Sequence, residues 1–136
     1  MDPVYLEKLN RAIHLRDNKD ESGAIRILND LYRDFPDHTL PLPLIGGIYL
    51  KNAQYNEASY YFNMHTKLKP SNWISSQGLY SALLNLSEVE GALNEGLRML
   101  KLFDSGVEIS PLRNQGDHSD LKEYLDEIIC LASEKD

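Results

Sequence analysis

The sequence predicts an all-α fold, a solenoid of about three helix-turn-helix repeats followed by a C-terminal capping helix. Apolar residues recur at helical spacing in successive segments, and turn residues separate these segments. A last segment restores the helical period after a connector, as expected of a helix that covers the end of a stack. Residues of similar kind also return after 34 positions in one register, in three pairs: Ala24 and Ala58, Leu28 and Phe62, and Pro36 and Pro70.

The composition is that of one globular domain. The chain has 136 residues, of which 42% are hydrophobic, so it is large enough to bury a core. Its 14 basic and 21 acidic residues give a net charge of -7, which disfavours nucleic acid because phosphate contacts need clustered Lys and Arg. A basic or neutral protein partner fits this charge better. The alternative is that the acidity only keeps the protein in solution.

The N-terminus and the single cysteine indicate a cytoplasmic protein. Residues 1–10 contain no basic stretch followed by an apolar core, so they do not look like a signal peptide. No apolar run approaches the roughly 18 residues of a membrane span. Cys130 alone can form neither an internal disulfide nor a zinc cage. We therefore expect a chain in the reducing cytoplasm that binds no membrane and no nucleic acid.

The first pair of helices is predicted before Pro36. Asp2 followed by Pro3 marks a helix start, because the carboxylate accepts from free N–H groups and Pro is tolerated at the first helical position. The polar run of residues 16–22 then breaks the apolar pattern. A second helix follows this turn and ends just before Pro36, since the residue preceding a proline disfavours the helical conformation.

The second pair is predicted within residues 39–72. Its first helix begins at about Pro41, because Pro41 and Pro43 both fall in the first turn, where most N–H groups lack a helical acceptor. The two helices cross where both carry small residues, Gly46 on the first and Ala58 on the second. A larger side chain at either position would push the helices apart.

A third pair and a last helix are predicted in the rest of the chain. Asn72 caps a helix that starts at Trp73, and its partner helix covers residues 89–103. A connector, residues 104–118, shows no sustained period. The capping helix, residues 119–134, carries one apolar stripe: Leu121, Leu125, Ile128, Ile129 and Ala132.

The middle pair resembles a tetratricopeptide repeat, a family with a period of 34 residues. The residues that carry the resemblance are packing residues: Leu42, Ile45, Gly46, Tyr49, Ala58, Phe62 and Pro70. The resemblance extends over units of about 5–38, 39–72 and 73–106. It weakens in the third unit, where Gly96 stands in place of an aromatic residue or Leu, and Asp104 in place of Pro. It implies a protein-binding scaffold without catalytic activity.

The resemblance also implies which residues face a partner. In this family the first helix of each unit lines a concave groove. The register places these groove candidates there: Leu6, Leu9, Ile13 and Arg16 from the first unit, Leu40, Pro43, Gly47, Leu50 and Lys51 from the second, and Ile74, Gln77, Ser81, Leu84 and Asn85 from the third. The set leans apolar, which suits an amphipathic helix or an extended peptide. For each residue the alternative is packing under a neighbouring helix.

The sequence offers no metal or cofactor site. None of His14, His38, His65 and His118 lies three or four residues from another, so no helix presents two of them to a metal. His65 is predicted to be a satisfied core histidine, and Cys130 a small buried residue. A catalytic role would need a base beside the thiol, and the sequence indicates none.

These observations predict a non-catalytic adaptor or chaperone that holds a peptide or helix of a partner protein. One form is a bacterial secretion chaperone, and another is an immunity protein or antitoxin that neutralises a basic toxin. An alternative from a different class is a structural module that forms a homodimer. Binding of acidic heat-shock chaperone tails is excluded, because the clamp positions of the first unit hold Leu9 and Ile13, which cannot donate hydrogen bonds.

Overall fold

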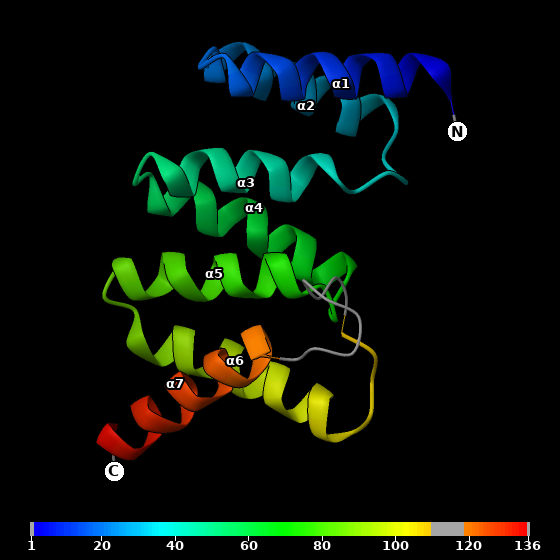
Figure 1. Cartoon of the computed structure of the whole chain (residues 1–136). Coiled ribbons are helices and arrows are strands. Elements are labelled where there is room, and N and C mark those ends of the chain that lie inside the picture. Colours follow the sequence, from blue (N-terminus) through cyan, green and yellow to red (C-terminus); the bar gives the residue numbers. More distant parts are fainter. Residues whose placement is uncertain (1, 110–118, 136) are drawn as a thin grey trace.

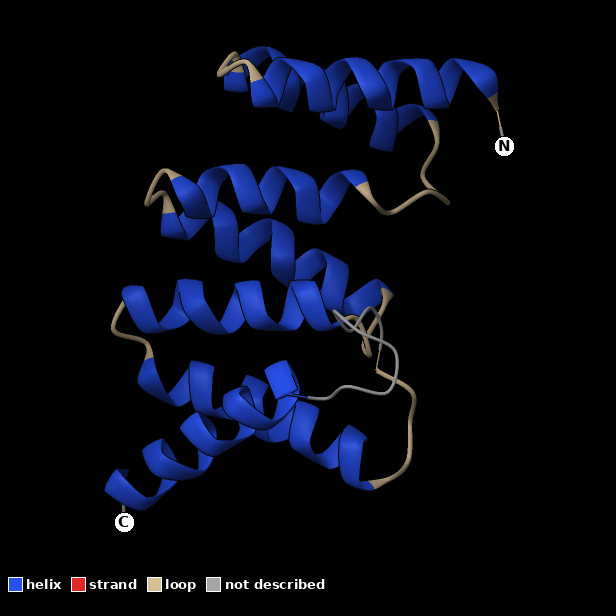
Figure 2. Ribbon diagram, viewed as in Figure 1, coloured by secondary structure: helices blue, strands red, loops and turns tan. Residues whose placement is uncertain are grey.

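The computed structural model describes residues 2–109 and 119–135, and all regular structure in these ranges is helical (Figures 1 and 2). The helices are α1 (Pro3–Asp17), α2 (Glu21–Asp34), α3 (Pro41–Lys51), α4 (Tyr55–Leu68), α5 (Trp73–Asn85), α6 (Val89–Asp104) and α7 (Ser119–Lys135). The predicted fold class, all-α repeats of about three units with a C-terminal helix, is confirmed.

Three antiparallel helix pairs are stacked along the molecule (Figure 1). The first helices of the pairs, α1, α3 and α5, run nearly side by side, and each second helix packs against the first helix of the next pair. The N-terminus lies at one end of the stack, and α7 crosses α6 at the other. Each pair therefore depends on its neighbours for a complete core.

The 34-residue repeat is visible in the backbone of the turns within each pair. Lys19, Ala53 and Ser87, spaced 34 residues apart, adopt φ values of 69°, 60° and 63°. The amide of the following residue donates to a carbonyl four positions before the turn residue, for example from Gln54 to Tyr49 over 2.9 Å. This hydrogen bond closes the preceding helix as in a Schellman motif. The sequence gave no signal for these turns, since none of the three residues is Gly.

Side-chain caps fix the helix starts that the sequence predicts. The Asp2 carboxylate accepts from the amide of Val4 over 2.8 Å, and the Asn72 side chain accepts from the amide of Ser75 over 2.9 Å. Helix α3 begins at Pro41, as expected from its two prolines. These caps confirm the predicted helix starts at Pro3, Pro41 and Trp73.

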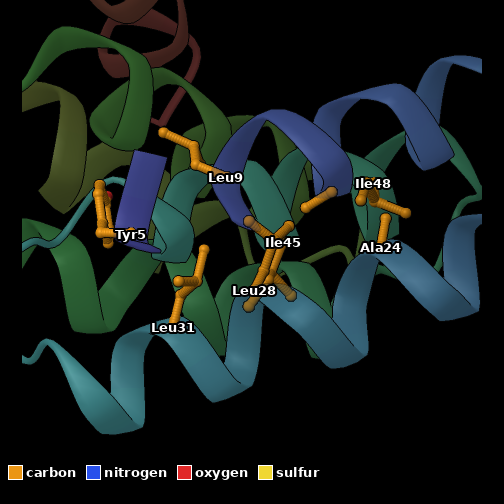
Figure 3. Close-up of a cluster of buried hydrophobic side chains, with 8 residues drawn as sticks. Tyr5, Leu9, Ala24, Leu28, Leu31, Ile45 and Ile48 are labelled. Atoms are coloured by element: carbon orange, nitrogen blue, oxygen red, sulfur yellow. The ribbon is translucent and has the colours of Figure 1, made fainter. Parts of the chain in front are cut away.

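The core of the first pair extends into the second pair (Figure 3). Leu9 of α1 and Leu28 and Leu31 of α2 form one buried cluster with Ile45 and Ile48 of α3. Because α3 supplies part of this core, the first pair is not an independent unit.

Phe62 of α4 is the central packing residue of the middle pair. A Cβ atom added to Gly46 of α3 would lie 3.0 Å from the Phe62 ring, and one added to Gly78 of α5 would lie 2.5 Å from it. Ala58 is fully buried one turn earlier. Small residues at Gly46 and Ala58 therefore allow the close packing that the sequence predicts, and Gly78 extends it to the third pair.

Helix α7 explains the glycine that departs from the repeat pattern in the third pair. A Cβ atom on Gly96 would lie 1.9 Å from Cδ1 of Ile128, so only Gly leaves room for α7 to pack against α6. Burial and the nearby carboxylate of Glu127 raise the pKa of the Tyr80 phenol, which places α7 against α5 as well. The third pair is thus adapted to receive a helix at the position where a stacking repeat has a large side chain.

Two predictions for α7 are wrong. Cys130 is exposed, not buried, and the side chain of Ile129 is 53% exposed. Only part of the predicted stripe can contact α6 because the helix crosses it at an angle, and Ile128 occupies the contact. Most of the predicted connector and the side chains of Leu121, Leu125 and Ala132 lie outside the described residues.

Candidate partner-binding surface

Two adjoining pockets flank helix α3. The first, of about 380 Å³, is called the apolar pocket here and is lined by Thr39, Leu40, Pro43, Leu44, His65, Lys69, Ser71, Asn72 and Ile74. The second, of about 430 Å³, is called the charged pocket and is lined by Arg16, Asp17, Lys19, Glu21, Pro43, Leu44, Gly47, Ile48 and Lys51. Pro43 and Leu44 line both pockets, so the two form one surface, the α3 groove.

The apolar pocket has exposed aliphatic walls and a fixed floor. Leu40 is 48% exposed and Ile74 is 50% exposed. His65 is buried, and its ring nitrogens are hydrogen-bonded to the hydroxyls of Ser75 and, over 3.1 Å, of Thr39. Burial, and secondarily the charge of Lys69, lower the pKa of His65. His65 is therefore the satisfied core histidine that the sequence predicts, and the neutral ring holds α4, α5 and the residues before α3 together.

In the charged pocket the two acidic groups already have partners. Arg16 pairs with the adjacent Asp17 over 3.0 Å, and the side-chain amide of Asn52 donates to Glu21 over 3.0 Å. Lys19 and Lys51 are exposed, and neither forms an ion pair with another described residue. The positive charges that remain available in this pocket are thus those of two lysines.

Gly47 opens the middle of the groove. A Cβ atom added there would have no neighbour within 4 Å, so the backbone of α3 is uncovered at this point. A Gly inside a helix costs about 0.5–1 kcal/mol relative to Ala. The position therefore accepts a side chain without a clash, and any such side chain would project into the space beside the charged pocket.

The α3 groove brings together only some of the predicted partner-binding residues. Arg16 and Lys51 line the charged pocket. Of the other groove candidates, Leu40, Pro43, Gly47 and Ile74 also line one of the pockets. These residues share a surface that is continuous along α3.

Other predicted residues lie outside both pockets. Leu9 is only 8% exposed, and Ile13 packs against the same core cluster, so little of either side chain is available to a partner. Leu50 and Leu84 are half-buried against the cores of the second and third pairs. The rest of the set is exposed beyond the pockets: Leu6, Gln77 and Asn85. Contact of these residues with a partner stays a prediction.

Sequence reasoning missed groove residues that lie outside the first helices. Lys19 and Glu21 come from the turn after α1, and His65 and Lys69 from the end of α4. The register of the turns could have indicated Lys19, because Lys19, Ala53 and Ser87 repeat at 34 residues.

The distribution of charge along the chain was a second missed signal. Residues 1–87 contain nine acidic and nine basic residues, whereas residues 88–136 contain twelve acidic and five basic residues. The whole net charge of -7 thus belongs to the C-terminal part of the sequence. Helices α3 and α5 together carry a single charged residue, Lys51. The surface around α3 is therefore not acidic.

A further pocket, of about 550 Å³, lies between α4, α5 and α6. Tyr60 is 61% exposed at its edge, which confirms that the aromatic run of α4 leaves a tyrosine in solvent. Its charged groups are paired with each other: Glu95 accepts from Ser76 over 2.6 Å and from Arg98 over 2.9 Å. Arg98 also donates to the carbonyl of Pro70. This network joins α5, α6 and the loop before α5.

Known structures resemble the chain in fold. The tetratricopeptide repeat domain of Sgt2 from Aspergillus fumigatus matches with a TM-score of 0.72 and 15% identity, over 98% of this chain and 82% of that chain. A fragment of MamA from Desulfovibrio magneticus RS-1 matches with a TM-score of 0.64 and 17% identity, over 97% and 77%. No protein-family model and no curated protein sequence matches. None of the described helices has the length and apolar character to cross a membrane. The chain has the fold of a tetratricopeptide repeat domain.

Proposed function

We propose that this chain is a non-catalytic adaptor that binds a segment of a partner protein along the α3 groove. The observation that supports this best is the junction of two pockets through Pro43 and Leu44, with exposed Leu40 and Ile74 at one end. Exposed aliphatic side chains around a hollow are typical of protein-binding sites, because their burial releases about 25 cal/mol per Å² of apolar surface.

The groups beside the groove that could act in catalysis are occupied in packing. Ser75 is fully buried and hydrogen-bonded to His65, which is itself buried. A nucleophile and its base must both reach a substrate, and this pair lies beneath the surface. The arrangement therefore supports binding rather than catalysis.

Within this proposal the adaptor serves either as a secretion chaperone or as an immunity protein. A chaperone keeps its partner soluble before export, whereas an immunity protein abolishes the activity of a toxin. Co-expression separates the two: a chaperone raises the soluble yield of its partner, and an immunity protein restores growth of cells that make the toxin.

Two glycines allow a matched test of the binding surface. Gly47→Trp fills the middle of the α3 groove, while Gly91→Trp places the same side chain in the pocket between α4 and α6, where a Cβ atom meets only Leu83 at 3.6 Å. Each variant is used as bait in a lysate of the source organism, after circular dichroism shows that it is folded.

The proposal predicts a protein captured by the parent and by Gly91→Trp but not by Gly47→Trp. Capture that is lost only with Gly91→Trp would move the binding surface to the α4–α6 side and contradict the proposal. Sedimentation at tens of micromolar tests the homodimer: a dimer broken by Gly47→Trp would mean that the groove binds a second copy of the chain.

A further inference from the structure

We infer that the partner segment held by the α3 groove is acidic and aliphatic: an extended stretch with carboxylates beside aliphatic side chains. This inference rests on the proposed function. It runs opposite to the basic partner that the net charge of the whole chain favours, because the charge near the groove differs from the charge of the chain.

The charged pocket favours a carboxylate. Its two acidic residues are neutralised within the protein, Asp17 by Arg16 and Glu21 by the amide of Asn52. Lys19 and Lys51 are left exposed without an ion pair among the described residues. A bound carboxylate would find two ammonium groups here, whereas a bound lysine would face them as like charges.

The apolar pocket favours aliphatic side chains next to a further acidic one. Leu40, Pro43, Leu44 and Ile74 form its walls, and two of them are half-exposed. Lys69 lies at the same pocket and is exposed. An aliphatic side chain would bury apolar surface against these walls, and a neighbouring carboxylate would reach Lys69.

The spacing along α3 sets the length of the segment. Leu40 and Lys51 are eleven residues apart, which is about 16 Å along a helix. An extended chain covers this distance with about five residues. Gly47 lies between the two pockets with nothing above its Cα, so the backbone of the segment can approach α3 closely there.

The acidic surplus of the molecule lies elsewhere in the sequence. Twelve of its acidic residues fall in residues 88–136, whereas Lys51 is the only charged residue of α3 and α5. Exposed charges are screened over about 8 Å at physiological salt. The lysines of the groove therefore determine the charge preference of a segment bound there.

Selection from random eight-residue peptides displayed on phage tests this inference. The parent, Gly47→Trp and Gly91→Trp are used as targets. The inference predicts that peptides retained by the parent and Gly91→Trp, but not by Gly47→Trp, are enriched in Asp or Glu beside Leu, Ile or Val. The best such peptide is then synthesised with a fluorescent label, and its affinity is measured by anisotropy.

A charge-reversed pair of variants gives the matched control. Lys19→Glu with Lys51→Glu should weaken the acidic peptide about tenfold at 0.15 M salt, since exposed ion pairs contribute modestly and reversal adds repulsion. Lys67→Glu with Lys101→Glu makes the same change of net charge at exposed lysines of α4 and α6. That control should change the affinity by less than about twofold, because these charges are screened from the groove.

The outcomes separate the inference from the proposed function. Basic peptides, or uncharged peptides, that depend on an open Gly47 position would overturn the acidic preference and leave the groove as the binding site. Equal weakening by both charge-reversed pairs would overturn the role of Lys19 and Lys51. The absence of any peptide sensitive to Gly47→Trp would contradict both the inference and the proposed function.

Discussion

At the scale of single residues, the turns within the helix pairs carry backbone strain. Lys19, Ala53 and Ser87 occupy the left-handed region, which costs a residue with a Cβ atom about 1–2 kcal/mol. Gly would relieve this cost but would add conformational entropy to the unfolded chain. The strained turn is kept in all three pairs, so the surrounding hydrogen bonds determine its shape.

We predict that Ala53→Gly raises the free energy of unfolding by about 0.5–1 kcal/mol, because relief of the positive φ outweighs the added entropy. Ala58→Gly is the matched control: the same substitution at a buried helical position should lower the stability by about 1 kcal/mol or more. Urea denaturation of both variants measures this. A loss of stability in Ala53→Gly would show that the turn does not adopt the left-handed conformation.

A second residue-scale prediction concerns pH and His65. Burial lowers the pKa of the folded histidine, while the unfolded chain titrates near 6.5. As the pH falls below about 6.5, the unfolded state takes up the proton first, so this histidine makes stability fall until the pH passes the folded pKa.

The change to test is His65→Gln, which removes the titrating group. The slope of stability against pH between about 5 and 6.5 should become flatter than in the parent, even though the variant is less stable at pH 8. Thermal unfolding across this range provides the slope. An unchanged slope would mean that His65 is not the buried neutral group described above.

At the scale of elements, α7 depends on one contact with α6. Gly96→Leu should destabilise the protein by about 1–3 kcal/mol, because a side chain there overlaps Ile128. Ile128→Ala alone should cost about 2–4 kcal/mol through lost packing. The double variant should be more stable than the sum of the single effects predicts by at least about 1 kcal/mol, since the overlap is then removed. Additive effects in urea denaturation would show that α7 does not pack against Gly96.

The helices could be predicted largely from local signals. Proline at Pro36 and Pro41 and capping at Asp2 and Asn72 act within one turn, so they can be read from neighbouring residues. The exposure of Cys130 could not be predicted, because it depends on the crossing angle of α7 over α6. The room at Gly96 likewise exists for a residue 32 positions away, Ile128.

At the scale of the whole molecule, the repeat register correctly indicates which helices share a face but not how the surface is hollowed. Arg16 and Lys51 lie in one pocket, as residues of neighbouring first helices. Leu9 has the same register position as Pro43 and yet packs into the core of the first pair. Pockets depend on turns and helix ends, and Lys19 and Lys69 entered the groove from these.

The central claim is that a partner contacts the α3 groove, and site-specific photo-cross-linking tests it most directly. A benzophenone side chain replaces Leu40 in the groove or, as the control, Tyr60 beside the α4–α6 pocket; both native side chains are large and exposed. The account predicts a covalent adduct with a partner from position 40 and none from position 60. Adducts only from position 60 would contradict it.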